Sequence, residues 1–195
     1  MTTATERPAA HPRYDPTRRD RIIDSCLDVI AEHGVAGASH RKIAAAAGVP
    51  LGSMTYHFDG FDDLLRAAFG RYAESVSAQF EERMQAASDL DEARTAVVTL
   101  ITEVVLGTRR DLVLLHELYT LAARDESYRT LTSAWMSRSR AALERHFDPM
   151  TARLIDALIE GLSLHRALDT TPHDPEIARI AIERITRTET AAPAR

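Results

Sequence analysis

The positions of the prolines are the feature that most constrains this chain. None of the eight falls between Pro50 and Pro149, which leaves 98 consecutive residues without a proline. Proline breaks a helix interior but fits the first helical turn, and the proline-free stretch is rich in the helix formers Ala, Leu, Glu and Arg. No alternating apolar pattern of strand length and no internal repeat stands out. We therefore expect an all-α protein.

Aspartate followed by proline predicts the starts of three helices, because Asp is a good N-cap and Pro fits the first helical position. Asp15-Pro16 opens a helix to about Glu32, which stops at His33-Gly34. Asp148-Pro149 opens a helix through Leu168, and Asp174-Pro175 opens the last one. Apolar residues at helical spacing predict four more helices. They lie at about 61–87, 89–107, 110–123 and 127–146.

The first helix carries the only cysteine, Cys26, in an apolar stripe with Ile22, Ile23, Leu27 and Ile30. Nothing cationic adjoins it on that face, so a packed structural thiol is expected. A single cysteine allows neither an intramolecular disulfide nor a thiolate zinc cage. We expect no metal site and no cofactor.

Two short helices with a tight glycine-containing turn between them follow. Ser39 caps a helix over 40–47, Gly48 ends it, and a second helix covers 53–58. This is the helix-turn-helix arrangement, although a purely structural helical hairpin would share the pattern. The start of the first helix offers donors to DNA phosphates, and the second carries short polar and aromatic groups that can reach base edges.

Charge restricts where DNA could bind. Residues 1–60 carry seven basic and seven acidic side chains, whereas the remaining 135 carry 17 basic and 22 acidic ones and account for the net charge of −5. Because phosphates repel an acidic surface, only the N-terminal third suits DNA. A solvated, arginine-bearing tail would give the same count.

Residues 18–69 resemble the DNA-binding domain of the tetracycline-repressor family. The resemblance is strongest over 39–58 and in the Leu-Leu pair of 62–65, and the spacing matches the family pattern: a Ser or Thr cap, Arg two residues on, Ile-Ala, Ala-Gly-Val, Gly, His-Phe and Leu-Leu. It implies a regulator that binds double-stranded palindromic operator DNA as a homodimer and answers to a small molecule. The expected DNA contacts are Ser39, His40, Arg41, Pro50, Leu51, Gly52, Ser53, Thr55, Tyr56 and His57.

Two positions depart from the family pattern. Thr55 stands where the family usually has Tyr, and the aromatic is displaced to Tyr56, which one helical step turns by about 100°. Phe61 stands where the family usually has Lys. The phosphate contact usually made by the Tyr does not carry over to Thr55, and we expect the backbone contact of the Lys to be lost at Phe61. Arg66, one turn further on, is a candidate replacement for the Lys.

The sequence divides into an expected disordered tail over 1–14, a helix-turn-helix domain over 15–60 and a helical ligand-binding and dimerisation domain over 61–190. The helix from about Phe61 is expected to be the only continuous link between the two domains. The helix from Pro149 is apolar over more of its circumference than one core needs, which predicts burial against both its own body and a second copy. Extra burial within a monomer is the alternative.

Polar and aromatic groups among aliphatic helices predict a ligand pocket in the body. The candidates are Glu103, His116, Tyr119, Trp135, Met136 and His165. Each could equally be a packed side chain. They suggest a largely apolar effector with one polar or anionic end, and a repressor that this effector releases from DNA.

Other functions have less support in the sequence. It lacks the metal-binding Glu-x-x-His and His-Glu-x-x-His motifs, a Gly-x-Ser-x-Gly motif and a phosphate-binding glycine loop, so an all-α enzyme is a distant alternative. The nearer alternative is a regulator whose body binds a protein or nothing. With neither a signal sequence nor a membrane span recognisable, a cytoplasmic protein that does not bind membranes is expected.

Overall fold

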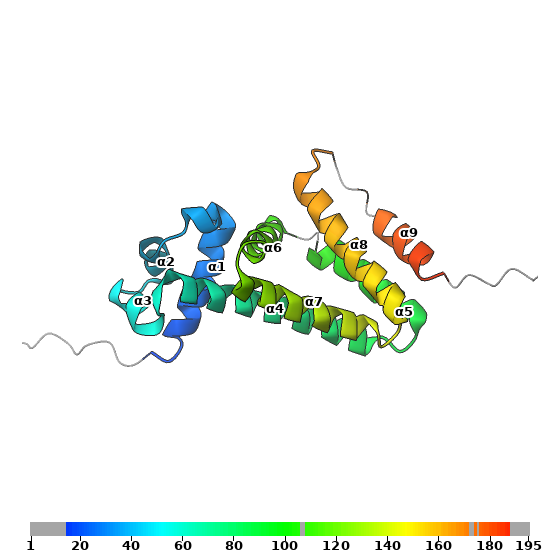
Figure 1. The fold of residues 1–195 in the computed structure, drawn as a ribbon, viewed down its shortest axis with the longest axis horizontal. Helices are drawn as coiled ribbons and strands as arrows, with labels where there is room; N and C mark the ends of the chain where they lie inside the picture. The colour runs from blue at the N-terminus through cyan, green and yellow to red at the C-terminus, as the bar shows by residue number, and fades with distance from the viewer. Residues whose placement is uncertain (1–14, 106–107, 172–173, 175, 188–195) are drawn as a thin grey trace, which may run out of the picture.

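The computed structural model describes residues 15–105, 108–171, 174 and 176–187. Over these residues the chain is helical and contains no strand, so the all-α prediction is confirmed (Figure 1). The expected tail at 1–14, the helix end near Gly107 and the start at Pro175 lie outside the described residues. The elements are α1 (Arg18–Gly37), α2 (His40–Ala47), α3 (Gly52–His57), α4 (Gly60–Ala86), α5 (Leu90–Thr99), the π-helix η1 (Leu100–Val105), α6 (Arg109–Ala122), α7 (Glu126–Leu143), α8 (Pro149–Leu168) and α9 (Glu176–Ile185).

Both ends of α1 differ from the prediction. The helix begins at Arg18 because the Asp15 carboxylate accepts hydrogen bonds from the Thr17 amide (3.0 Å) and hydroxyl (2.8 Å), closing a turn ahead of it. At its other end the chain does not leave the helix at Gly34. It breaks the helical geometry there, with φ 68° and ψ 169°, and then resumes to Gly37.

Gly34 also permits a close approach between α1 and α6. A Cβ atom at this position would lie 2.7 Å from Oε1 of Glu117 on α6, and the positive φ is one that side-chain-bearing residues rarely adopt. A glycine that reads in the sequence as a helix stop is therefore also the point where a body helix meets the head, which we define as α1–α3.

The first of two apolar cores joins the head to the body. Ile22, Cys26 and Ile30 of α1 belong to one buried cluster with Leu118 of α6 and Tyr128 of α7. The expected packed thiol is confirmed, and burial raises the pKa of Cys26 to about 12. Because α6 packs on α1, head and body are also in direct contact, in addition to the long helix α4 that joins them along the chain.

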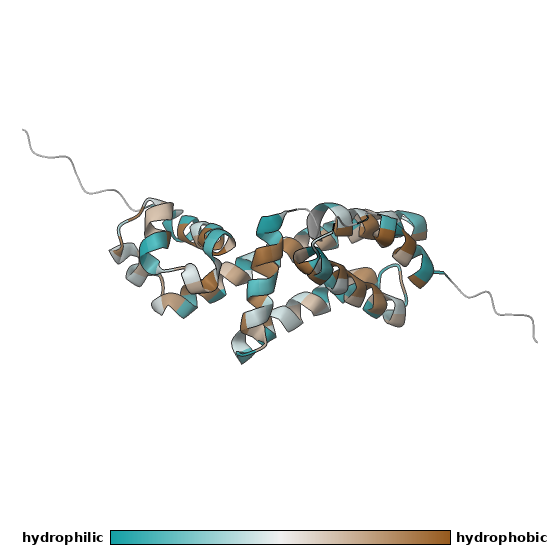
Figure 2. Ribbon diagram, turned by 90° about the horizontal axis from the view of Figure 1, so that it is seen from above, coloured by the Kyte–Doolittle hydropathy of each residue, from teal (hydrophilic) through white to brown (hydrophobic). Residues whose placement is uncertain are grey.

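The second core lies at the far end of the body, where α4 ends. It combines Phe80 and Met84 of α4 with residues of α5, η1, α7, α8 and α9. In the views, α4 and α7 run side by side from the head, and α8 and α9 pack beyond them (Figures 1 and 2). Hydrophobic residues gather where the body helices face one another (Figure 2).

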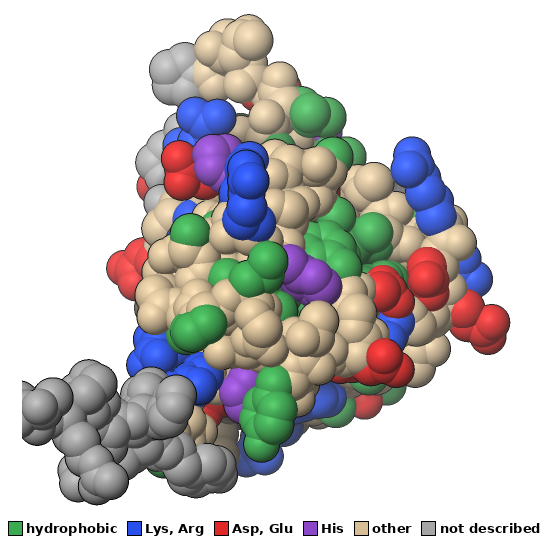
Figure 3. All heavy atoms as spheres, turned by 90° about the vertical axis from the view of Figure 1, so that its left-hand side faces the viewer, with side chains coloured by type: hydrophobic (Ala, Val, Ile, Leu, Met, Phe, Trp, Pro, Cys, Tyr) green, Lys and Arg blue, Asp and Glu red, His purple; other side chains and the backbone are tan. Residues whose placement is uncertain are grey.

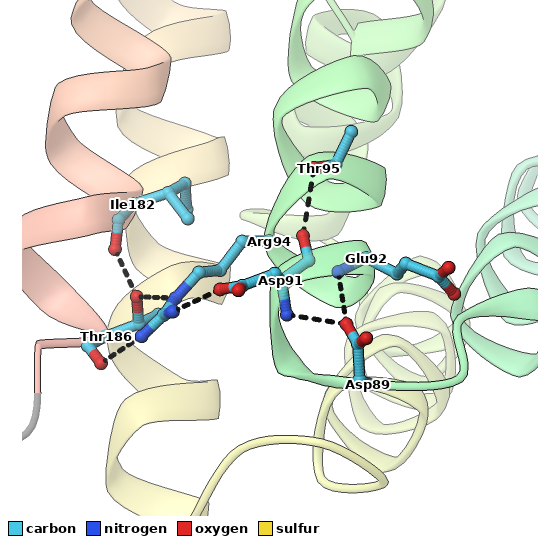
Figure 4. Close-up of polar contacts among 7 residues, drawn as sticks. All are labelled: Asp89, Asp91, Glu92, Arg94, Thr95, Ile182 and Thr186. Atoms are coloured by element: carbon cyan, nitrogen blue, oxygen red, sulfur yellow. Dashed lines mark hydrogen bonds and ion pairs between the residues drawn. The ribbon is translucent and has the colours of Figure 1, made fainter.

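An arginine of α5 holds the C-terminal end of α9 (Figure 4). Arg94 donates to the Thr186 hydroxyl (2.7 Å) and carbonyl (2.9 Å), and to Asp91 one turn back (2.7 Å). Asp89 caps α5 by accepting from the amides of Asp91 and Glu92. These bonds tie the end of α9 to α5, and Ala178 and Ile182 on the inward face of α9 pack into the second core.

Candidate functional site

The helix-turn-helix is built by caps and a shared core. The Ser39 side chain accepts a hydrogen bond from the Lys42 amide (3.3 Å), and this cap starts α2 as predicted. Gly48 ends α2 in the left-handed conformation, with φ 63°. Ile43 on α2 and Met54 on α3 are fully buried and pack into the first core. The opposite faces of the two short helices are consequently turned to solvent.

Most of the expected DNA contacts lie on this outer surface. Tyr56 is 80% exposed and Leu51 54%, which is unusual for side chains of this size. Ser39, Arg41, Pro50, Gly52 and Thr55 are also exposed. Figure 3 views the molecule from this end and shows basic and histidine side chains interspersed on the face, with acidic ones gathered mainly at one edge.

Ser53 is placed differently from its neighbours. It is only 8% exposed, on the side of α3 that carries the buried Met54. An inward position leaves Thr55 and Tyr56 as the polar groups of α3 that reach outward. The Thr55 hydroxyl donates to the Gly52 carbonyl at 3.2 Å and keeps its lone pairs for another donor.

The two histidines of the motif are half-buried by aromatic neighbours. The His40 ring packs edge-on against the Phe61 ring, with 5.4 Å between the ring centroids. The buried Nε2 of His40 has no hydrogen-bond partner among the described residues. The His57 ring contacts Tyr56 at 4.9 Å. Phe61, at the position where the family usually has Lys, therefore gives His40 a packing surface.

Arg66, near the start of α4, is engaged in an ion pair. It pairs with Asp62 one turn earlier on α4, and Asp62 in turn accepts from the Tyr128 hydroxyl of α7 at 2.8 Å. This chain of contacts fixes the start of α4 to α7. Arg41 differs, since none of the hydrogen bonds or ion pairs found among the described residues includes it.

A cavity of about 360 Å³ lies between head and body. Five helices line it: α1 through Asp24 and Leu27, α4 through residues including Arg71 and Tyr72, α6 through residues including Arg110, α7 through Trp135, and α8 through Ile159, Glu160 and Ser163. Its wall is mixed, with aliphatic and aromatic side chains beside charged ones. A small-molecule site has this composition.

Glu160 is the most unusual group in the cavity wall. Its Oε2 accepts from the Tyr119 hydroxyl at 2.7 Å. Burial raises the pKa of Glu160 against the lowering effect of that hydrogen bond, and Asp156 one turn earlier raises it further. Burial, with the nearby Glu160, also raises the pKa of Tyr119 well above its ordinary value, so the phenol remains a donor.

The structure brings together only some of the side chains suggested for ligand binding. Trp135 lines the cavity, and Tyr119 donates to the Glu160 carboxylate in its wall. Met136 lines a second, smaller cavity that shares Trp135 and Glu160 with the first. His116 lines a separate hollow between α6 and the end of α8, with its Nδ1 2.7 Å from the Leu112 carbonyl oxygen. Glu103 is exposed near Arg83, and His165 is exposed on α8; neither lines the cavity.

Sequence reasoning missed Glu160, Arg71 and Asp24. The available signal for Glu160 was an acidic residue inside the apolar circumference of the helix from Pro149, next to Ile159. Arg71 and Asp24 carried no local signal. They meet because α1 and α4 cross, with an Nη1 to Oδ1 distance of 2.9 Å.

Comparisons with known proteins agree with this geometry. The family model described as "Bacterial regulatory proteins, tetR family" matches residues 22–68, and the one described as "Tetracyclin repressor-like, C-terminal domain" matches residues 89–188. The chain belongs to the tetracycline-repressor family. It is therefore a transcriptional regulator of that family, whose members bind operator DNA and typically act as dimers with small-molecule ligands.

Similar proteins share most of its length. A protein of Streptomyces coelicolor A3(2), described as a transcriptional regulator, is 59% identical and superposes with a TM-score of 0.80, covering 89% of this chain and 100% of its own. The multidrug binding protein EbrR, solved with imidazole, is 37% identical with a TM-score of 0.75, covering 91% and 99%. The HTH-type transcriptional regulator PksA of Bacillus subtilis (strain 168) is 29% identical in an alignment 167 residues long that covers 78% of this chain and 80% of PksA.

The relatives named in these comparisons are regulators or small-molecule-binding proteins. EbrR has also been solved with ethidium, proflavin and malachite green. Among the described helices of this chain, none combines the length and apolarity that crossing a membrane requires.

Proposed function

We propose that this tetracycline-repressor family member is a repressor that binds a palindromic operator as a homodimer and is released by a small molecule bound in the cavity between head and body. The observation that carries this proposal is the wall of the cavity. Asp24 and Leu27 come from the head, and Ile159 and Glu160 come from α8. A ligand there would touch both the DNA-binding part and the helix that bears the proposed dimer surface.

DNA binding is assigned to the outer surface of α2, α3 and the turn between them. Arg41 is exposed near the start of α2 and suits a phosphate, while Thr55 and Tyr56 project from α3 and suit base edges. Because one head reads one half-site, a two-fold dimer needs two half-sites about one or more helical turns apart.

The dimer surface is assigned to α8 and α9. Residues spaced by three and four positions form one exposed, apolar stripe along α8: Met150, Leu154, Ala157, Gly161, Leu164 and Leu168. On α9, Ile177 and Ile180 are also exposed. An apolar stripe of this length on a soluble helix marks an interface, and an isologous contact with a second copy would cover it on both subunits.

Release follows from differential binding. A ligand weakens DNA binding only if it favours a head arrangement that the operator does not fit. EbrR, similar over nearly the whole chain, holds small molecules, which supports an effector here too. The alternative is a regulator whose body binds a protein or nothing.

The deciding experiment combines a DNA shift assay with the fluorescence of Trp135, the only tryptophan. Specific binding to DNA upstream of the protein's own gene, lost on adding a compound that also changes Trp135 emission, would support the proposal. Linkage further requires that operator DNA weaken compound binding by the factor by which the compound weakens DNA binding. Equal compound affinities with and without DNA, for a compound that still displaces the protein, would point to direct competition at the head.

A further inference from the structure

The geometry points to a lipophilic cation as the effector, with Glu160 as its counter-ion and the rings of Tyr72 and Trp135 as its aromatic surroundings. This inference rests on the proposed function and adds the charge of the ligand, for which the sequence suggested a polar or anionic end. It assigns Glu160 a specificity-determining role.

The ion pairs around the cavity leave the Glu160 charge without a cation. Arg71 pairs with Asp20 and Asp24 of α1. Arg110 donates to Asp28 at 2.8 Å and lies 3.8 Å from Asp111.

No ion pair among the described residues includes Glu160. Three acids and two arginines line the cavity, and carboxylates engage both arginines. An anion entering here would meet an acidic wall whose basic groups are already occupied, whereas a cation would meet a carboxylate that lacks one.

The neighbouring acid, Asp156, does not compete for the ligand. It pairs with Arg140 of α7 at 3.0 Å, and both side chains are largely buried. Asp156 and Glu160 both line a second, smaller cavity of about 40 Å³. The charge of Asp156 is therefore balanced within the protein. Glu160 is the acid of α8 that lines the cavity without an ion-pair partner among the described residues.

The aromatic rings suit a cation with flat apolar groups. The centroid of the Trp135 ring lies 6.0 Å from that of Tyr72, and the two rings are nearly perpendicular. It lies 6.4 Å from the centroid of Tyr119, and these two rings are inclined by 35°. Ring faces attract cations through their quadrupole, most strongly where water is excluded. Tyr119 also donates its hydroxyl proton to Glu160, which holds the carboxylate in place beside the rings.

The test uses two ions of nearly the same shape and opposite charge, tetraphenylphosphonium and tetraphenylborate. Each is titrated into the full-length protein while Trp135 emission is followed. We expect the phosphonium to bind at least tenfold more tightly than the borate. Glu160→Gln keeps the size of the side chain and an acceptor for Tyr119, and should weaken phosphonium binding roughly tenfold or more while leaving borate binding equal or stronger.

Glu103→Gln is the matched control, because it removes the same charge from an exposed site outside the cavity. Its phosphonium affinity should equal that of the wild type, and an equal loss in both variants would mean that overall charge, and not Glu160, attracts the cation. Borate binding as tightly as phosphonium would overturn the cation inference while leaving an effector cavity. If neither ion changed Trp135 emission or thermal stability, the cation inference would be wrong, and the proposed cavity would be judged separately by the DNA-release experiment above.

Discussion

Single residues of α2 and α3 divide between those buried in the motif's core and those exposed on its outer surface. Ser53 and Thr55 are two positions apart and looked equivalent in the sequence, yet one is buried and the other exposed. In a helix of six residues the sequence does not show which polar side chains face the core. So short a segment contains too few apolar positions to tell which side of the helix is buried. The exposed surface of the motif was therefore predictable as a region, and the exposure of its individual side chains only in part; the DNA contacts themselves stay a prediction.

Arg41→Ala should weaken DNA binding for all sequences alike and reduce its dependence on salt, because phosphate contacts carry no base information. Thr55→Ala should instead change which bases are preferred, by roughly 1–3 kcal/mol per good contact. Binding isotherms at two salt concentrations and selection from a randomised operator library measure the two effects. An unchanged salt slope in the first variant would remove Arg41 from the interface.

The ionisation of Glu160 should make cation binding depend on pH. A cation binds the ionised carboxylate and not the neutral acid, so affinity falls as the pH drops through the pKa of Glu160. Because burial raises this pKa above the ordinary 4.5, the loss should begin at a higher pH than for an exposed glutamate. Tetraphenylphosphonium titrations from pH 7 to about 4 measure this. Glu160→Gln should flatten the profile, and a profile that persists in this variant would show that a group other than Glu160 controls the pH dependence.

At the scale of helices, apolar spacing together with proline and capping residues placed most elements within a few positions. Asp148, Asp89 and Ser39 cap α8, α5 and α2, and they are recognisable because a cap needs only a local sequence. The π-helix η1 and the resumption of α1 after Gly34 were not predicted. Both depend on packing against helices distant in the sequence, which no local pattern records.

Gly34→Ala should destabilise the protein by about 1–3 kcal/mol, chiefly through the backbone conformation at φ 68° that alanine tolerates poorly. Gly70→Ala is its control, since it lies within α4 with nothing within 4 Å of the added Cβ. That change should be neutral or stabilising by up to about 1 kcal/mol. Urea unfolding measures both. Equal stabilities would mean that α1 adjusts at Gly34 without cost.

For the whole molecule, the sequence indicated correctly that α8 is apolar on more than one side but not which leucines lie on each. Leu162 is buried in the second core and Leu158 packs partly against it, whereas Leu154 and Leu164 are exposed. A helical wheel gives the angles between side chains around α8. Only the packed structure shows which side of α8 contacts the other helices of the same chain.

Replacing Leu154 and Leu164 together with Glu should give soluble, helical monomers that have lost tight binding to a palindrome. Charges on the outer stripe oppose an apolar interface without entering the monomer's core. Sedimentation measures the size, and circular dichroism checks that the helices remain. A double variant that still sediments as a dimer would place the interface elsewhere.

The core shared by α1, α6 and α7 bears on the engineering of chimeric regulators. Leu114, Leu118 and Tyr128 complete an apolar core that Ile22 and Ile30 begin. A head cut out after α3 and joined to another body would expose this surface or meet side chains of a different shape. A transplant intended to carry operator specificity should therefore include α6 and the start of α7, and with them the head-side wall of the cavity.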